Sequence, residues 1–241
     1  MTYLQFHFVF IIPVIALLWY FLPKNIPDTN GKHFFYLIWI MGIAFIYTTP
    51  WDNYLVYRGV WDYGNERILG VIGYVPIEEY MFFLLQPILT GLFFYHVYTR
   101  NTHERPTGKT YPFVRNFGAG LGMLIALFGA YMLYFDETTY LGLILAWAAP
   151  VFSGMWFLVG SALWDIKRTF FWSFAIPTVY LWVADRIAIG LGIWEISTTY
   201  TIGWHILGLP IEEATFFLVT NLMCLGGLAV FMRLWEGASS K

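Results

Sequence analysis

The sequence predicts an all-α integral membrane protein with seven transmembrane helices. Three observations carry this prediction. Hydrophobic residues make up 59% of the 241 residues and charged residues only 12%, whereas soluble domains average about 45–50% and about 25%. Seven apolar runs are long enough to cross a bilayer, which takes about 20 residues each. The first three runs and the last three share short motifs, which indicates an internal repeat.

The seven apolar runs give the expected helices in chain order. Their limits are Leu4–Leu22, Phe34–Pro50, Pro76–Tyr98, Phe113–Phe135, Tyr140–Leu163, Thr169–Ile189 and Trp204–Met232. The first run lacks a preceding basic region and a small-residue cleavage site. We therefore expect a retained helix rather than a signal peptide.

Basic residues predict how the chain is threaded through the membrane. With the N-terminus outside, ten Lys and Arg residues fall in cytoplasmic segments: Lys24, Lys32, Arg100, Arg105, Lys109, Arg115, Lys167, Arg168, Arg233 and Lys241. Only Arg58, Arg67 and Arg186 fall outside. Because cytoplasmic loops are enriched in Lys and Arg, we expect a multi-pass protein of the cell membrane with its C-terminus in the cytoplasm. The net charge of −2 argues against a nucleic-acid partner.

The repeated motifs divide the chain. The string Pro-Ile-Glu-Glu occurs at Pro76–Glu79 and Pro210–Glu213, and Asp52 matches Asp185 at an offset of 133 residues. We expect a single integrated domain made of a three-helix repeat in residues 1–111, a connector helix in residues 112–136 and a second three-helix repeat in residues 137–241. Because one helix separates the repeats, they are parallel, and a pseudo-two-fold axis along the membrane normal would place equivalent residues on opposite walls of one cavity.

Short β-hairpins are expected on the outer side of the membrane. The alternation around Gly64 and Asn65 predicts one hairpin between the second and third helices. The stretch 192–204, rich in Ile, Thr, Trp and Tyr, predicts a second one.

The paired glutamates are the first candidates for chemistry, because an ionised carboxyl inside a membrane costs a few kcal/mol and is usually functional. The alternative is an ordinary helix start, where Pro and Glu are both favoured. Apolar residues before each Pro, and the roughly 100° between adjacent helical positions, favour the functional interpretation. The candidate catalytic residues are Glu78, Glu79, Glu212, Glu213, Asp52 and Asp185. The two aspartates would support the glutamates or relay protons. An ordinary acid at the membrane interface is an equally good interpretation of both.

Aromatic residues beside the glutamates and in the expected hairpins are candidates for binding substrate. They are Trp61, Phe82, Phe83, Trp194, Phe216 and Phe217. Most other aromatic residues fit a membrane-interface belt. The five His residues have no metal-ligand spacing, so no metal is expected. Gln86 and Asn221 are expected to form interhelical hydrogen bonds.

An acid, a base and aromatic walls in a dry cavity suit one class of reaction. A carboxyl group in apolar surroundings tends to remain protonated near neutrality and can act as a general acid. Aromatic faces stabilise a cation, by about 2 kcal/mol when desolvated. These parts suit protonation of an alkene, cyclisation through a carbocation and deprotonation.

The chain also resembles a known family, the membrane-integral lycopene cyclases of the two-domain type. The matching segments are Thr49–Tyr54, Gly59–Trp61, Pro76–Phe83, Ala184–Ala188, Gly192–Glu195 and Pro210–Phe217. The resemblance implies a fused enzyme that acts on lycopene or a related acyclic carotenoid within membrane lipid. In such enzymes the terminal isopropylidene double bond is protonated, a six-membered ring closes, and loss of a proton sets the ring double bond. We expect β-rings, and therefore β-carotene, as the product. No dinucleotide fingerprint occurs, so no cofactor is expected.

Other functions remain to be weighed. A proton or ion transporter would also use symmetric intramembrane acids. A retinal photoreceptor would need a lysine in the last helix, and residues 204–232 contain none. A prenyltransferase would need Asp-rich metal–diphosphate motifs, and the sequence contains none. The sequence leaves open which glutamate is the acid, which ring forms, whether both ends react, and the oligomeric state.

Overall fold

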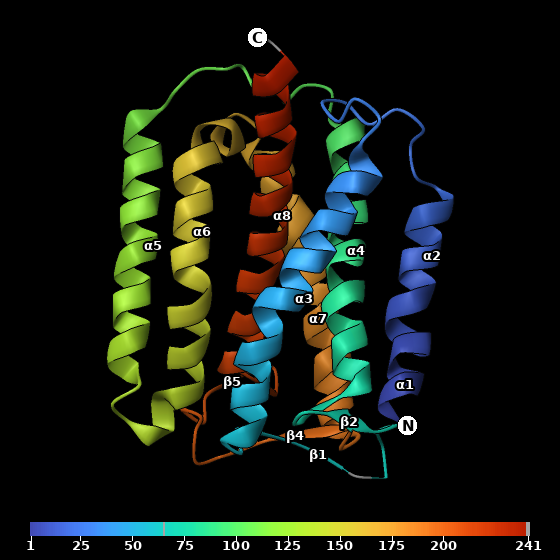
Figure 1. Ribbon diagram of the computed structural model, residues 1–241, viewed down its shortest axis with the longest axis vertical. Helices are drawn as coiled ribbons and strands as arrows, with labels where there is room; N and C mark the ends of the chain where they lie inside the picture. The colour runs from blue at the N-terminus through green and yellow to red at the C-terminus, as the bar shows by residue number, and fades with distance from the viewer. Residues whose placement is uncertain (65, 240–241) are drawn as a thin grey trace.

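Long helices that run side by side form a bundle, with short strands gathered at one end (Figure 1). This computed structural model describes residues 1–64 and 66–239, without the side chains of residues 233–239. Asn65 and Lys241, which entered the hairpin and orientation predictions, lie outside the described residues, and so do the side chains of Arg233 and Glu236.

The first rod is built from α1 (Tyr3–Phe6), the π-helical turn η1 (His7–Ile11) and α2 (Ile12–Tyr20). It begins with a capping box, in which the Thr2 hydroxyl accepts from the Gln5 amide and the Gln5 side chain accepts from the Thr2 amide. The other helices are α3 (His33–Tyr57), α4 (Ile77–Arg100), α5 (Pro112–Met132), α6 (Thr139–Asp165, preceded by the 3-10 turn η2, Asp136–Thr138), α7 (Lys167–Gly190) and α8 (Ile211–Ser239).

Six helices in the described part of the chain are long and apolar enough to cross a membrane. They are Tyr3–Tyr20, His33–Tyr57, Ile77–Arg100, Pro112–Met132, Asp136–Asp165 and Ile211–Met232. The helix outside this set is α7, which has 24 residues. Charged residues at both of its ends, Lys167 and Arg168 at one and Asp185 and Arg186 at the other, make it less apolar.

The centre of the bundle is formed by α4 and α8. In their apolar stretches 61% and 56% of the residues are buried inside the protein, against 17% in α5. The helix α5 lies at the edge of the bundle beside α6 (Figure 1). Small residues allow these two helices to approach closely, since a Cβ added to Gly122 would lie 2.9 Å from the Cβ of Ser153.

The helix limits differ from the apolar runs in two places. Pro50 lies inside α3, which continues to Tyr57, because a membrane helix tolerates proline where its surroundings satisfy the freed backbone groups. Asp52 is therefore inside a helix and not at its end. The prediction that the last helix starts at Trp204 is wrong, because His205–Ile206 and Leu209–Pro210 are strands and α8 begins at Ile211.

The strands form three two-stranded sheets. The pairs are β1 (Trp61–Tyr63) with β4 (Trp194–Ile196), β2 (Val71–Ile72) with β3 (Val75–Pro76), and β5 (His205–Ile206) with β6 (Leu209–Pro210), all antiparallel. Two short hairpins therefore exist, but each lies just before a Pro-Ile-Glu-Glu string. The hairpin predicted around Gly64 is wrong, because β1 pairs with β4 from the other half of the chain.

A glycine lies in the turn of each of the two hairpins. Gly73 has φ +67° and Gly208 has φ +84°, values that glycine adopts without strain. A Cβ on Gly73 would also lie 2.4 Å from the side-chain oxygen of Asn53 in α3. The Tyr74 amide donates to that same oxygen at 2.9 Å, so the turn is fixed against the end of α3.

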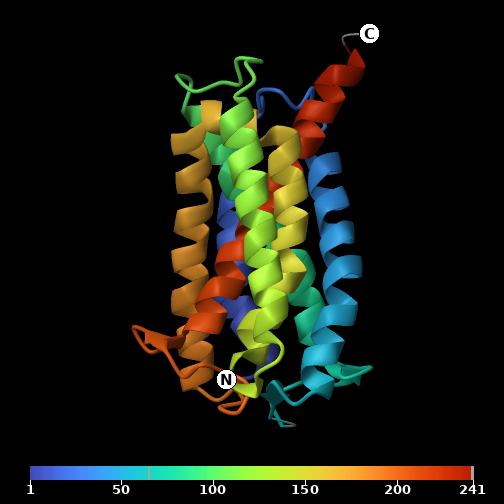
Figure 2. The same cartoon turned by 90° about the vertical axis from the view of Figure 1, so that its left-hand side faces the viewer.

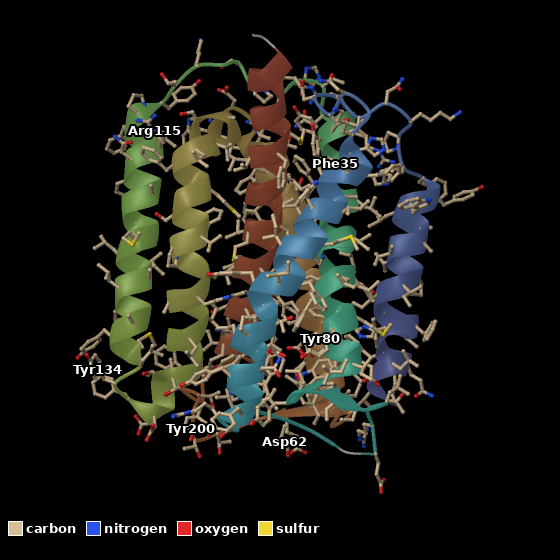
Figure 3. The ribbon with its side chains drawn as sticks, viewed as in Figure 1. Phe35, Asp62, Tyr80, Arg115, Tyr134 and Tyr200 are labelled. Carbon is tan, nitrogen blue, oxygen red and sulfur yellow. The ribbon has the colours of Figure 1, made fainter. Side chains whose placement is uncertain are left out.

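The two ends of the bundle carry different groups. The chain starts at the end with the strands and finishes at the other end (Figure 1). Asp62 and Tyr200 lie at the strand end, and Arg115 lies near the opposite end (Figure 3). Figure 2 shows α7 running along the bundle beside the other helices.

Candidate active site

All six predicted acids are buried at the strand end of the bundle. Their exposed fractions lie between 0% and 2%. The glutamates occupy the first turns of α4 and α8, as the helix-start interpretation expects. Burial of both members of each pair exceeds what capping requires. The label on Tyr80, which follows Glu79 directly, marks this level of the bundle in Figure 3.

The first glutamate of each pair holds the preceding loop. Oε1 of Glu78 accepts a hydrogen bond from the Leu69 amide at 2.8 Å. Oε1 of Glu212 accepts one from the Ile202 amide at the same distance. In both residues Oε2 is buried without a hydrogen-bond partner. These two carboxyls therefore bind the backbone of the loop that leads into each hairpin.

The second glutamate of each pair accepts hydrogen bonds from tyrosines. Oε2 of Glu79 accepts from the Tyr3 hydroxyl at 2.5 Å and from the Tyr63 hydroxyl at 3.2 Å. Oε1 of Glu213 accepts from the Tyr140 hydroxyl at 2.6 Å. Burial, followed by the charge of Glu79, raises the pKa of Tyr63 well above its usual range, so this phenol, which lies in β1, stays a donor.

The two aspartates differ in their partners. Oδ1 of Asp185 accepts from the indole N–H of Trp194 at 3.0 Å. Oδ2 of Asp52 is buried without a partner, and so is the indole N–H of Trp61. The aspartate and the tryptophan are therefore hydrogen-bonded to each other in the second half of the chain, and not in the first.

One small cavity brings the two halves of the chain together. We call it the acid cavity, and it is lined by Tyr3, Phe6, Trp61, Glu79, Phe82, Leu181, Asp185, Trp194, Glu213, Phe216 and Phe217. It contains the second glutamate of each pair and the carboxyl of Asp185. Glu78, Glu212, Asp52 and Phe83 do not line it. The prediction of a shared chamber for both pairs thus applies to one member of each.

The aromatic walls of the acid cavity come from both halves. Trp194 packs on Tyr3, with ring centroids 4.8 Å apart. Trp61 lies edge-on to Tyr140 at 6.0 Å. Each tryptophan therefore contacts a tyrosine from the other half of the chain. Tyr3, beside Trp194, binds Glu79, and Tyr140, beside Trp61, binds Glu213.

Several residues at this site were not singled out from the sequence. Tyr3, Tyr63 and Tyr140 lie among 17 tyrosines, most of which suit a membrane-interface belt, so tyrosine type gave no signal. The positions of Tyr3 and Tyr140, each in the first turn of the first helix of an expected repeat, were the available clue.

His7 is the other residue that the sequence did not indicate. Its Nε2 lies 2.8 Å from the carbonyl oxygen of Glu78, and a carbonyl only accepts, so Nε2 carries the hydrogen. Nδ1 is buried without a partner. His7 begins the π-helical turn η1, a feature that often occurs at functional sites. No group of three or more His, Cys, Asp or Glu side chains in the described residues is placed to hold a metal ion.

Comparison with known proteins gives matches to both halves of the chain. A family model described as "Lycopene cyclase" matches residues 1–98 and 137–231. A protein named lycopene beta-cyclase from Halobacterium salinarum is 43% identical over 194 residues, which are 80% of each chain.

Two fungal proteins are also similar. The bifunctional lycopene cyclase/phytoene synthase of Podospora anserina is 36% identical over 242 residues, covering 95% of this chain and 40% of that protein. Its namesake from Neurospora crassa is 34% identical over 239 residues, covering 93% of this chain and 38% of that protein. The chain therefore spans well under half of these fungal relatives. No solved structure matches the chain.

Proposed function

The chain belongs to the lycopene cyclase family, which is a family of enzymes, and from that premise we propose that it closes the acyclic ends of lycopene, or of a related acyclic carotenoid, into β-rings to give β-carotene. The observation that carries the mechanism is the pairing of Glu79 and Glu213 across one cavity with aromatic walls. The reaction is redox-neutral and uses only proton transfer.

The proposed reaction has three steps. A carboxylic acid in the acid cavity gives its proton to the terminal isopropylidene double bond, forming a C–H bond and a tertiary cation. The next double bond attacks this cation and closes a six-membered ring through a new C–C bond. A carboxylate then takes a proton from the ring, which sets the ring double bond. One proton enters and one leaves, so the carotenoid changes only its connectivity.

The second glutamates are the proposed acid and base. Glu79 and Glu213 line the cavity, whereas Glu78 and Glu212 bind loop amides. Asp185 lies in the same cavity and can relay a proton between them. Asp52 is buried at the same end of the bundle but does not line the acid cavity, which suits a supporting role.

The two glutamates exchange roles in this scheme. Closing one ring moves a proton from the acid to the base, so the former base becomes the acid for the next ring. A pseudo-two-fold arrangement suits this exchange, because lycopene has two equivalent ends.

The tyrosines and aromatic rings have distinct proposed tasks. Tyr3, Tyr63 and Tyr140 are positioning residues, since their hydroxyls fix the orientation of the two carboxyls. The rings of Trp61, Trp194, Phe82, Phe216 and Phe217 surround the cavity and stabilise the cation, as aromatic faces do in a desolvated site. Phe83, outside the acid cavity, contributes to a neighbouring cavity.

We further propose that α7 also crosses the membrane, giving seven spans in two parallel repeats, residues 1–111 and 137–241, joined by a connector in residues 112–136. At 1.5 Å per residue, its 24 residues are long enough for a bilayer core of about 30 Å. Equivalent hydrogen bonds support the repeat, notably those that Leu69 and Ile202 make to Glu78 and Glu212.

We propose that the strand end faces outward and the other end faces the cytoplasm of a cell membrane. The loops and helix termini that contain Lys24, Lys32, Arg105 and Lys109 all lie at the end away from the strands. This distribution agrees with the positive-inside rule.

Expression in a lycopene-accumulating bacterium tests the function. The wild-type chain should convert red lycopene into cyclic carotenoids, as measured by chromatography of the extracted pigment. Glu79→Gln and Glu213→Gln should each lower conversion by about 10²–10⁴-fold, the usual contribution of a general acid or base. Glu137→Gln, which changes an exposed carboxyl in η2, should keep full activity.

Two results would contradict the proposal. Unchanged lycopene in cells that contain the membrane-inserted wild-type chain would remove the cyclase function. Full activity in both Glu79→Gln and Glu213→Gln would remove the assignment of the site.

A further inference from the structure

A second cavity lies beside the acid cavity, between α3, α4, α6 and α8. We call it the lateral cavity, and the lining residues that matter here are Ile43, Tyr47, Gln86, Val151, Phe216 and Thr220. Its volume is about 140 Å³, whereas the acid cavity measures about 10 Å³, close to the minimum for one water molecule. The site that contains the carboxyls is therefore narrow, and the larger space lies next to it.

The wall between the two cavities is one aromatic ring. Phe216 lines both of them. Its ring stacks on Trp51 with a centroid distance of 5.8 Å and lies edge-on to Trp61 at 6.2 Å. Movement of this side chain would join the two spaces.

The lateral cavity is also close to the lipid-facing surface. A surface groove lined by Ile43, Ile46, Tyr47, Pro50, Trp51 and Trp147 shares Ile43, Tyr47 and Trp147 with it. Ile43 is 46% exposed. The Tyr47 hydroxyl donates to the carbonyl of Trp147 at 3.0 Å, so one hydrogen bond between α3 and α6 separates the groove from the lateral cavity.

The Gln86 amide and the Thr220 hydroxyl in the wall of the lateral cavity donate to groups of the protein. The Gln86 amide donates to Thr220 Oγ1 at 2.8 Å and to Asn221 Oδ1 at 3.1 Å. The Thr220 hydroxyl in turn donates to the Phe216 carbonyl at 2.8 Å. A ligand here therefore meets an apolar surface, which suits an unsubstituted hydrocarbon chain.

We propose that the lateral cavity binds the polyene chain of the substrate while the end of that chain occupies the acid cavity, and that the substrate enters from the bilayer between α3 and α6. This inference rests on the proposed cyclase function. The groove and the lateral cavity share Tyr47 and Trp147, and the lateral cavity and the acid cavity share Phe216, so these residues are the two barriers on the proposed path. The substrate end passes both barriers to reach Glu79 and Glu213.

The chain supplies a matched control for this entrance. At the offset of 133 residues, Ile43 corresponds to Ile176 in α7 and Tyr47 to Tyr180. Ile176 is also 46% exposed. The Tyr180 hydroxyl donates to the carbonyl of Phe10 at 2.5 Å, which closes the equivalent interface between the first rod and α7.

Bulky substitutions test the inference. Ile43→Trp should fill the path and lower conversion of lycopene by at least about tenfold, because an overpacked site loses binding of that order. Ile176→Trp should remain within about twofold of the wild type. A second matched pair is Val151→Phe in the lateral cavity and Val14→Phe in α2. These two valines are 137 residues apart, which is also the spacing between Tyr3 and Tyr140 in the first helices of the two repeats.

Binding is measured separately from turnover. Purified protein carrying Glu79→Gln in lipid nanodiscs is titrated with lycopene, and quenching of tryptophan fluorescence is followed. Addition of Ile43→Trp should weaken binding by at least about tenfold, and addition of Ile176→Trp should not. Membrane insertion and thermal stability of all variants are compared with the wild type.

The outcomes separate the two proposals. Loss in Ile43→Trp and Val151→Phe alone supports the lateral entrance. Wild-type activity in both of them, or equal loss in all four variants, overturns it while the cyclase function stands. An inactive wild-type chain overturns the function itself.

Discussion

The hydrogen bonds between tyrosines and glutamates lead to an asymmetric prediction. Glu213 accepts one phenol hydroxyl, from Tyr140, whereas Glu79 accepts two, from Tyr3 and Tyr63. The change Tyr140→Phe removes only an oxygen and leaves the ring in place. It deprives Glu213 of its tyrosine donor, whereas Tyr3→Phe leaves Glu79 with a second one.

The size of the effect follows from the hydrogen bond that is lost. Hydrogen bonds to charged groups contribute about 1.5–3 kcal/mol, and about 1.4 kcal/mol corresponds to a tenfold change in rate. Tyr140→Phe should therefore lower kcat by about 10–100-fold, and Tyr3→Phe by less than about tenfold. The double variant Tyr3→Phe/Tyr63→Phe should fall to the level of Tyr140→Phe, with more loss than the two single changes predict together.

The assay measures initial rates with purified protein in lipid vesicles that contain lycopene. A positioning role predicts that kcat falls while KM is unchanged, because the substrate contacts are intact. Thermal stability should remain near that of the wild type. Equal losses in Tyr3→Phe and Tyr140→Phe, or a loss that lies entirely in KM, would refute the reasoning.

Other predictions follow from single contacts. Glu78→Ala removes the acceptor of the partly buried hydrogen bond from the Leu69 amide and should destabilise the protein by about 1–3 kcal/mol, seen as a lower Tm in detergent, whereas Glu78→Gln keeps an acceptor and should stay near the wild type; equal Tm values would contradict this. Trp194→Phe removes the indole donor to Asp185. It should lower kcat and leave Tm near that of the wild type, and a lower Tm with unchanged kcat would show that Trp194 contributes only packing. Gly73→Ala places a Cβ 2.4 Å from a side-chain oxygen at φ +67° and should lower Tm more than Gly59→Ala, which has φ +69° but open space; the reverse order would show that the contact is unimportant.

The sequence predicts most helices because hydropathy measures what a bilayer requires. The run Pro76–Tyr98 corresponds closely to α4, and Thr169–Ile189 to α7. The same measure failed at Trp204, since the hairpin before α8 is as apolar as a helix: Leu207 is 98% exposed at its turn. Hydropathy does not distinguish a strand at a membrane surface from the start of a span.

Pairing between distant segments was beyond the sequence. The strand β1 pairs with β4 across more than 130 residues, with Asp62 opposite Glu195. Local alternation indicates a strand but not its partner. The hydrogen bonds from Tyr3 and Tyr140 to the glutamates likewise depend on how the helices pack.

The separation of roles within each glutamate pair has a geometric cause. Adjacent helical residues point about 100° apart, so Glu78 and Glu79 cannot both face the bundle axis. Packing decides which one does, and the sequence treats both alike. In each half the first glutamate turns toward the hairpin segment and the second toward the acid cavity.

This geometry supports our proposal that the catalytic unit is Glu79 with Glu213, and not either Pro-Ile-Glu-Glu string alone. Protonation of the terminal double bond and loss of a ring proton occur at different carbons, so the proposed reaction needs an acid and a base at two positions along the substrate. Glu79 and Glu213 both line the acid cavity and can meet that need, whereas Glu78 is already bound to the Leu69 amide. Each half of the chain thus supplies its second glutamate, Asp185 comes from the second half, and neither half alone forms the acid cavity.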